Sequence, residues 1–419
     1  MSKRVVIVGG GIIGLFTAHY CVREGHEVTI IERDAKDHDC CCRGNAGMIC
    51  PSHFIPLAAP GMVATGLKMM GDPRSPFYIK PRLSWNLADW GMKFVEASTP
   101  EHVKKSATVL RDLQLGSRAE FVKLAKEEQF GFGLKQNGLL MLCKSGHALH
   151  EESAVAEQAR TLGIPAETLT ADETAGLDPT IDMDIAGSVY FPKDCHLNSA
   201  QLLADLTTSL IAAGVKFKWH TEVSDWERSG GHISALVTNN GNIEGDEYVL
   251  AGGAFSQAIA AKLGLHLPMQ AGKGYSVTLS RPPQLPKICS ILTEARVAVT
   301  PMGRTLRFGG TMEIAGLNKD INPERVRGIT DSASRYFPAF KGNHFHDLKP
   351  WAGLRPCSPD GLPYIGRTSR ARNLVVATGH AMLGLSLAPM TGKLVAQHMS
   401  DQKPEITAPE IDPDRFLGF

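Results

Sequence analysis

Three glycines near the start of the chain, Gly9, Gly11 and Gly14, form the pattern G-x-G-x-x-G, and an acidic residue, Glu32, follows at the end of the next apolar run. Glycines at this spacing let a phosphate approach the backbone, and a helix that begins there offers unpaired N–H groups to the anion. The carboxylate can accept hydrogen bonds from a ribose. These residues therefore predict binding of the pyrophosphate and ribose of an adenine dinucleotide.

The elements that must position these residues are a strand, a helix and a second strand. Residues 5–8 are a short β-branched run, which favours a buried parallel strand. Apolar residues at helical spacing follow, namely Ile12, Leu15, Ala18 and Val22, and Gly25 predicts the end of the helix. Residues 28–31 predict the second strand. This complete order, rather than the glycines alone, favours dinucleotide binding over an ordinary glycine-rich turn.

Length and composition limit the class of protein. A chain of 419 residues exceeds the size at which one core stops growing, so two domains are expected. The 44 Lys and Arg residues nearly balance the 43 Asp and Glu residues, which argues against a nucleic-acid partner. Nine cysteines without regular spacing favour a reducing compartment. No apolar run reaches the ~20 residues of a membrane span, so we expect a cytoplasmic protein, at most peripheral on the inner face of the cell membrane.

Two apolar regions of the first third of the chain allow more than one interpretation. Residues 54–70 are apolar but interrupted by prolines and glycines, so they predict no continuous helix. They form either a packed loop or a surface for a lipid or an electron-accepting partner. Residues 81–128 are predicted to be helical, and their stripe of Trp85, Trp90 and Phe94 is interpreted as core rather than as a binding surface.

Three consecutive cysteines, residues 40–42, have Cys50, His38 and His53 nearby in the sequence. Zinc ligands normally come as C-x₂₋₄-C pairs, so the run does not favour a metal site and we predict none. A reactive thiol is equally unsupported, and the role of the run stays open. The segment 45–47 is small and exposes its backbone, which suits a chain that passes a flat ring.

Several blocks occur in a specific order along the chain, and together they point to one family. They are Gly9 to Gly14 with Glu32, Asn45-Ala46-Gly47, Ala251-Gly252-Gly253, Gly353-Leu354-Arg355-Pro356 with Asp360-Gly361, and Gly379-His380 through Gly384. Over essentially its whole length the chain resembles the D-amino acid oxidase family of FAD-dependent amine oxidoreductases. Within that family it is most similar to the bacterial D-amino acid dehydrogenases, whose Asn-Ala-Gly and Lys-Gly-Tyr segments it shares.

The resemblance implies a fold class and a domain organisation. We expect an α/β protein with a discontinuous Rossmann-like FAD-binding domain and a mixed-sheet α+β substrate-binding domain. The expected ranges are 1–80, 185–260 and 350–419 for the FAD-binding domain, and 81–184 and 261–349 for the substrate-binding domain.

The resemblance also implies which residues bind FAD. The glycines would hold the pyrophosphate, Glu32 the ribose and Val223 the adenine, while the C-terminal block would close over the flavin. The implied set is Gly9, Gly11, Ile12, Ile13, Gly14, Glu32, Arg33, Asn45, Ala46, Gly47, Val223, Gly252, Gly379, His380, Leu383, Gly384 and Ser386.

FAD is expected to bind without a covalent link. The cysteine that carries the flavin in sarcosine-oxidase relatives has no match here, because Cys357 lies close to that position but out of register. Acid precipitation of the purified protein should therefore release the yellow flavin into the supernatant. Yellow colour that stays in the pellet would contradict this prediction.

Arg355 matches the arginine that clamps the substrate carboxylate in the family, and a guanidinium can meet a planar carboxylate with two parallel hydrogen bonds. A structural arginine between domains is the alternative. Tyr275 is a second candidate, as a hydroxyl donor to the substrate, although a core tyrosine is nearly as consistent with its position. Some relatives carry a second arginine where Met382 lies here. This departure favours apolar or cyclic D-amino acids over glycine.

The implied reaction is oxidative deamination of a D-amino acid. A hydride passes from Cα to flavin N5, water hydrolyses the imino acid to a 2-oxo acid and ammonia, and the electrons go to a quinone or another acceptor. No residue stands out as a catalytic base, and His380 is interpreted as a packing and hydrogen-bonding residue. Alternatives are a dehydrogenase of a cyclic imino acid such as hydroxy-D-proline, an oxidase that uses O₂, and an FAD-bound electron-relay subunit of a larger complex.

Overall fold

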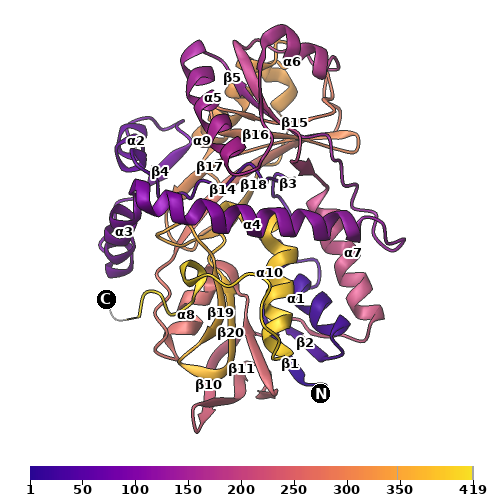
Figure 1. Ribbon diagram of the computed structural model, residues 1–419, viewed down its shortest axis with the longest axis vertical. Coiled ribbons are helices and arrows are strands. Elements are labelled where there is room, and N and C mark those ends of the chain that lie inside the picture. The colour runs from indigo at the N-terminus through magenta and orange to yellow at the C-terminus, as the bar shows by residue number, and fades with distance from the viewer. Residues whose placement is uncertain (347, 418–419) are drawn as a thin grey trace.

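The computed structural model describes residues 1–346 and 348–417. Two large sheets lie one above the other along the long axis of the molecule, and a long helix, α4, runs across the middle (Figure 1). The expected α/β fold with two sheet-based units is thus confirmed, and the segments of each unit come from distant parts of the chain.

The first sheet has six strands in the order β19-β20-β13-β1-β2-β9. Their bounds are β1 (Arg4–Val8), β2 (Glu27–Ile31), β9 (Lys216–Lys218), β13 (Glu247–Leu250), β19 (Tyr364–Thr368) and β20 (Ala371–Thr378). β1 pairs in parallel with both β2 and β13, and its side chains alternate between two cores. Val5 and Ile7 pack on one face and Val6 and Val8 on the other, which is why this strand is apolar throughout.

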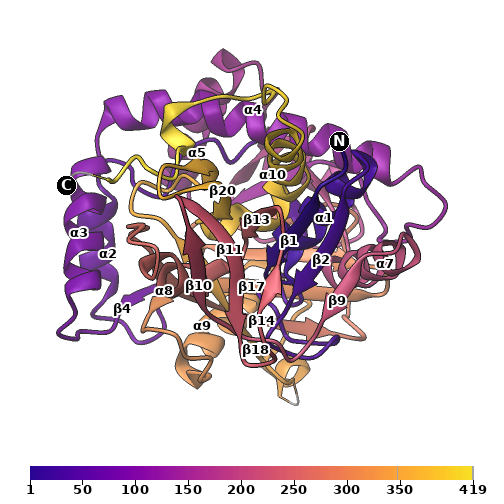
Figure 2. The ribbon, with the colours of Figure 1, turned by 90° about the horizontal axis from the view of Figure 1, so that it is seen from below.

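Helices cover one face of the first sheet and a small sheet covers the other. α1 (Ile12–Arg23), α7 (Ser199–Ala212) and α10 (Gly384–Met399) contribute to the same core as Val5 and Ile7. On the opposite face lie α8 (Ser256–Ala261) and the sheet of β10 (Val223–Ser229), β11 (His232–Thr238) and β12 (Ile243–Glu244). Figure 2 shows α1 and α10 on one side of β1 and the β10–β11 ribbon on the other.

The second sheet is mixed and has the order β18-β14-β17-β16-β15-β5-β7-β6, with β4 also paired to β17. The strands are β4 (Phe77–Ile79), β5 (Leu139–Cys143), β6 (Glu167–Thr170), β7 (Gly187–Phe191), β14 (Gln270–Leu279), β15 (Cys289–Leu292), β16 (Val297–Met302), β17 (Thr305–Ile314) and β18 (Trp351–Cys357). α5 (Gly146–Thr161), α6 (Ala171–Leu177) and α9 (Pro323–Tyr336) accompany it, and β3 (Met48–Ile49) pairs with β8 (Cys195–His196).

The expected domain boundaries differ from the sheets at three strands. β4, β7 and β18 fall in ranges expected for the FAD-binding domain, yet all three pair with strands of the second sheet. Local pattern identifies a strand but not the sheet that it joins, because that depends on pairing partners far away in the chain.

The region 81–128, expected to be helical, contains two helices. α3 (Trp85–Ala97) is followed by its capping residue Ser98. α4 (Pro100–Leu124) begins after Thr99, whose side chain accepts a hydrogen bond from the His102 amide. α4 packs on α10 so closely that a Cβ on Gly116 would lie 2.3 Å from the Met390 methyl group. α4 therefore joins the two units rather than belonging to the second alone. α2 (Met62–Met69) is a short helix within the region 54–70.

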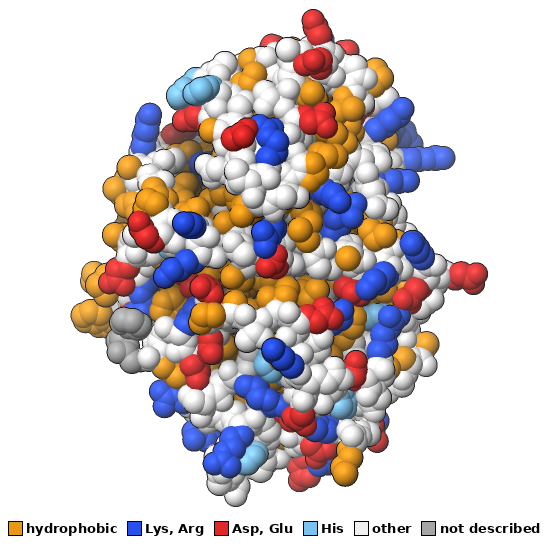
Figure 3. All heavy atoms as spheres, in the orientation of Figure 1, with side chains coloured by type: hydrophobic (Ala, Val, Ile, Leu, Met, Phe, Trp, Pro, Cys, Tyr) orange, Lys and Arg blue, Asp and Glu red, His pale blue; other side chains and the backbone are white. Residues whose placement is uncertain are grey.

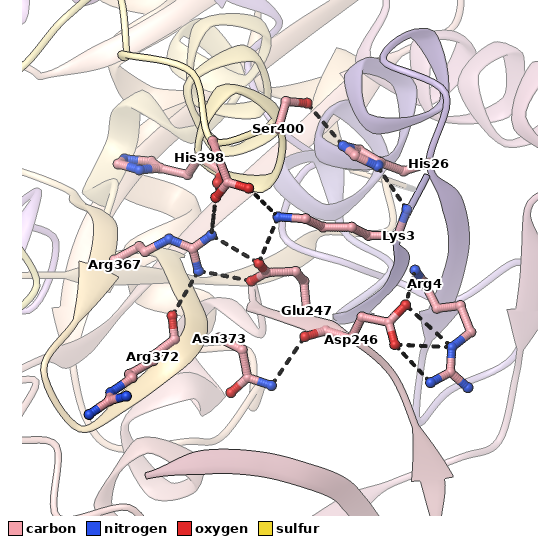
Figure 4. A network of polar contacts seen from close by, with 11 residues as sticks. Lys3, Arg4, His26, Asp246, Glu247, Arg367, Arg372, Asn373, His398 and Ser400 are labelled. Atoms are coloured by element: carbon pink, nitrogen blue, oxygen red, sulfur yellow. Dashed lines mark hydrogen bonds and ion pairs between the residues drawn. The ribbon is translucent and has the colours of Figure 1, made fainter. Parts of the chain in front are cut away.

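A network of hydrogen bonds and ion pairs links the strands of the first sheet at the amino ends of its parallel strands (Figure 4). The buried Glu247 carboxylate accepts hydrogen bonds from Lys3 Nζ and from both terminal nitrogens of Arg367. These contacts join the start of β1, the start of β13 and the strand β19. They leave the opposite end of the sheet, at the carboxyl ends of the parallel strands, open for a ligand.

Within the described residues, no helix combines the length and the apolar character that crossing a bilayer requires.

Candidate cofactor and substrate site

A large cavity lies at the carboxyl ends of the parallel strands, as is usual for ligand sites of α/β sheets. Its walls include the last residues of four strands or the residues that follow them: Val8 and Gly9, Ile31 and Glu32, Leu250 and Ala251, and Ala377 and Thr378. Residues from the edge strand β18 of the second sheet complete the wall. The cavity is therefore bounded by both sheets.

The three glycines of the first turn have different environments. A Cβ on Gly9 would lie 2.5 Å from the Ala251 carbonyl oxygen, and a Cβ on Gly14 would lie 1.9 Å from the Gly9 oxygen. Nothing lies within 4 Å of the Cβ position of Gly11, which faces the cavity. Gly11 is also the residue before α1, and no side chain caps this end of the helix. The helix N-terminus and the open space at Gly11 fit a phosphate group.

Glu32 is buried at the end of β2, where its carboxylate accepts hydrogen bonds from the backbone amides of Gly10 and Asp34. His38 lies beside it, with Nε2 at 3.8 Å from Glu32 Oε2, and this nitrogen is buried without a hydrogen-bond partner among the described residues. Both side chains line the cavity. A ligand with hydroxyl groups, such as a ribose, would satisfy them. No sequence motif includes His38, so its position in the cavity could not be predicted from the sequence.

The loop that contains residues 45–47 is held from the second sheet. Arg307 Nη1 donates to the carbonyl oxygens of Arg43 and Asn45, and Ser276 Oγ donates to the Gly44 oxygen. Asn45 lines the cavity, whereas Ala46 and Gly47 do not. A Cβ on Gly47 would lie 2.2 Å from the Leu197 oxygen, so this glycine serves close packing.

The C-terminal block approaches the cavity from the other side. His380 is buried, its Nε2 is 3.0 Å from Thr391 Oγ1, and its Nδ1 has no partner among the described residues. Burial lowers the pKa of His380 to about 3, so the ring is neutral at physiological pH. His380 and Gly384 line the cavity, but Gly379, Leu383 and Ser386 do not. Ser386 instead accepts a hydrogen bond from the Cys50 amide and donates one to Gln114.

Arg355 lies on β18 and faces the cavity. Its Nη1 donates to the carbonyl oxygen of Thr311, a residue with a positive φ of 71°. No carboxylate of the described residues lies within ion-pairing distance of the guanidinium. A partly buried cation without an anionic partner favours binding of an anion from outside the chain.

Tyr275 lies on the opposite face of the second sheet from Arg355. In the β14–β18 pairing Arg355 is opposite Gly272 and Tyr275 is opposite Ala352, so the two side chains project to different faces. The Tyr275 hydroxyl is buried and donates to Glu313 Oε2 at 2.6 Å. This placement contradicts the expectation that Tyr275 reaches a substrate held by Arg355, and it matches the alternative of a core tyrosine.

The guanidinium of Arg355 lies against Gly274, in space that a side chain at position 274 would occupy. A Cβ on Gly274 would lie 2.2 Å from Nη2 of Arg355, so Gly274→Ala should displace the guanidinium. We expect KM for the substrate to rise about tenfold or more, the effect of losing one charge-assisted hydrogen bond. Gly309→Ala is the matched control, because its Cβ would have only ordinary contacts, the nearest at 3.7 Å. Steady-state kinetics of both variants check this, and equal KM values would contradict it.

Cys40, Cys41 and Cys42 also line the cavity, and Lys319 reaches it from the loop after β17. Lys319 belongs to no sequence motif; its Nζ donates to the Asp39 carbonyl oxygen at 2.6 Å. Cys50 and His53 do not join the cysteine run; they lie with Asp194 in a separate group whose possible ligand atoms are within 4.8 Å of one another. Ser52 donates to both Asp194 oxygens, and we still predict no metal there.

The residues of the cavity fit an FAD molecule. The open Gly11 turn, the uncapped N-terminus of α1 and the buried Glu32 suit its pyrophosphate and ribose, and the unpaired nitrogens of His38 and His380 offer further contacts. Of the expected set, the cavity wall contains Gly9, Gly11, Ile12, Ile13, Glu32, Arg33, Asn45, Val223, Gly252, His380 and Gly384. Arg33 also lies over the ring of Phe255, at 3.6 Å from its centroid.

Comparison with known proteins gives consistent matches. The family model described as FAD dependent oxidoreductase matches residues 4–398. A D-amino acid dehydrogenase of Paramagnetospirillum magneticum is 30% identical over 99% of both chains, and one of Helicobacter pylori is 29% identical over 96% of both. Among solved structures, glycine oxidase from Geobacillus kaustophilus matches with a TM-score of 0.78 and 24% identity, covering 100% of both chains.

Proposed function

The chain belongs to the FAD-dependent oxidoreductase family, as its resemblance predicted, and we propose that it oxidises D-amino acids to 2-oxo acids and ammonia. The observation that carries this proposal is Arg355, a guanidinium without a carboxylate partner among the described residues, in the same cavity as the glycine turn and Glu32. The names of the relatives at 28–30% identity support the choice of D-amino acids.

In the proposed reaction, FAD supplies the two-electron acceptor. Arg355 binds the substrate α-carboxylate and thereby orients Cα and the amino group within the cavity. The Thr311 carbonyl oxygen accepts a hydrogen bond from Arg355 Nη1 and so helps to fix the orientation of the guanidinium. Burial lowers the pKa of His380 to about 3, which makes its ring a weak base, and its Nε2 is hydrogen-bonded to Thr391. Its role is therefore to shape the wall and hydrogen-bond rather than to remove a proton. Met382, which is 46% exposed, adds an apolar surface that favours apolar or cyclic side chains.

The test is anaerobic reduction of the bound flavin by a panel of D- and L-amino acids. We expect bleaching of the flavin absorbance by apolar D-amino acids and slow or no bleaching by their L-enantiomers. Bleaching by L-amino acids alone would overturn the proposed stereochemistry. Absence of bleaching by any amino acid would instead favour an electron-relay subunit, and preference for hydroxy-D-proline would favour the cyclic imino acid.

We propose that the electrons pass to a quinone or a similar lipid-soluble carrier at a membrane surface. Support comes from exposed hydrophobic side chains on α2 and α3, among them Leu67 and Trp85. α3 also contacts β18, since the Trp90 indole donates a hydrogen bond to the Cys357 carbonyl oxygen. Steady-state turnover in air distinguishes this from an oxidase, because stoichiometric peroxide production would identify O₂ as the acceptor.

A further inference from the structure

Half of the large hydrophobic side chains that are exposed in the described residues come from one segment of 33 residues. They project from α2, from the residue that precedes the cap of α3, and from α3 itself. We call this set the α2–α3 face; it consists of Val63, Leu67, Leu83, Trp85, Met92 and Val95. Figures 1 and 2 both place α2 and α3 side by side at one edge of the molecule, and Figure 3 shows hydrophobic side chains gathered along that edge.

α3 is apolar on two opposite sides. Its inner side carries Trp90, with Leu87 and Phe94 packed in the same cluster, and the Trp90 indole donates to the Cys357 carbonyl oxygen at 2.9 Å. Its outer side carries Trp85, Met92 and Val95, which align on one stripe because a helix has 3.6 residues per turn. A surface helix normally has a polar outer side. The interpretation of the aromatic stripe as core is therefore correct for Trp90 and wrong for Trp85.

The exposure of this face is large enough to require an explanation. Trp85 is 90% exposed, Leu83 is fully exposed and Leu67 is 67% exposed. Single exposed hydrophobic residues are ordinary on protein surfaces, but a contiguous group marks an interaction site. Because the side chains project outward rather than line a groove, the face suits insertion into a soft apolar layer better than the docking of a single peptide.

The charges around the face complement an anionic bilayer. Residues 62–105 contain seven Lys and Arg residues and four Asp and Glu residues. Lys68 is exposed and follows Leu67 in the chain, and Lys80 is exposed three residues before Leu83. Lys104 and Lys105 are exposed on α4, close to the end of α3 in the chain. Two other cations of the segment are already in ion pairs, Lys93 with Asp89 and Arg74 with Glu324 and Asp331. Without these pairs, five cations face three acidic residues in the segment, so a cationic excess remains. Tryptophan with flanking lysine is the usual combination at the lipid headgroup level.

We propose that the α2–α3 face docks the protein onto the surface of an anionic lipid bilayer, with Leu83 and Trp85 inserted among the headgroups. The inner side of α3 packs with Cys357, Met312 and Ala381, and Ala381 lines the cavity. One helix then separates the bilayer from the cavity wall. The docking surface rests on the proposed function for its purpose, since a lipid-soluble electron acceptor would be found in that bilayer.

The test is flotation of the FAD-loaded protein with vesicles of phosphatidylcholine alone and of phosphatidylcholine with phosphatidylglycerol. We expect binding that is stronger with phosphatidylglycerol and weaker at high salt. Leu83→Ser with Trp85→Ser should reduce the vesicle partition coefficient at least about tenfold. Leu177→Ser with Ile211→Ser is the matched control, because these residues are exposed hydrophobics of α6 and α7. It should bind vesicles like the unmodified protein.

Three outcomes would overturn the docking surface. One is no vesicle binding by the unmodified protein, and another is equal loss of binding in the control variant. The third is a dimer in solution that the Leu83→Ser, Trp85→Ser variant dissociates, since a second copy would then cover the face. Anaerobic flavin bleaching by D-amino acids is measured on the same samples. Bleaching without vesicle binding refutes only the surface, and vesicle binding without bleaching refutes only the proposed reaction.

Discussion

Arg355→Ala should raise KM for a D-amino acid at least about 100-fold while FAD remains bound. The guanidinium can give the carboxylate two charge-assisted hydrogen bonds, each contributing about 1.5–3 kcal/mol, and about 1.4 kcal/mol corresponds to a factor of ten. FAD should stay bound because the glycine turn and Glu32 lie at the other wall of the cavity. Steady-state kinetics with an artificial dye, together with the flavin absorbance of the purified variant, measure both quantities.

Two further variants make this prediction specific. Arg355→Lys keeps the charge but not the planar fork, so its KM should lie between those of the unmodified protein and the alanine variant. Arg370→Ala removes an exposed arginine from the turn between β19 and β20 and should leave KM unchanged. If Arg355→Ala has an ordinary KM, the guanidinium does not hold the substrate and Arg355 is a structural residue.

Gly11→Val should abolish tight FAD binding and leave the protein folded. No atom of the described chain lies within 4 Å of the position where a Cβ would stand, so the new side chain starts in open space. It would instead fill the space at the N-terminus of α1 that a pyrophosphate needs. We expect the dissociation constant of FAD to rise at least about 100-fold, from the loss of several charge-assisted hydrogen bonds.

Titration of the apoprotein with FAD measures this effect, and thermal unfolding of the apoprotein checks the fold. Gly176→Val is the control, because Gly176 lies in α6 and also has no neighbour within 4 Å of its Cβ position. Its FAD affinity should be unchanged. An apoprotein of Gly11→Val that unfolds at a much lower temperature would show that Gly11 supports the fold instead, and unchanged FAD affinity would remove the turn from the site.

Local patterns in the chain were sufficient for the glycine turn and the acidic residue of the first strand–helix–strand unit. The β1 strand, the α1 helix and the β2 strand are contiguous, so the glycine spacing and the apolar periodicity already place Gly11 and Glu32 at the same end of the sheet. The arginine on β18 was identified by resemblance, and its presence in the cavity needed the pairing of β18 with β14.

Other features were decided only by tertiary structure. Alternation along β14 puts Tyr275 on the same face as Lys273, but only the register with β18 shows that this face is turned away from Arg355. Helical periodicity finds two apolar sides on α3 and cannot tell which one the protein covers. Cavity residues such as His38 and Lys319 come from irregular loops, which carry no periodic signal. Periodicity is a property of neighbouring residues, whereas the choice of face, sheet and partner depends on contacts between residues far apart in the chain.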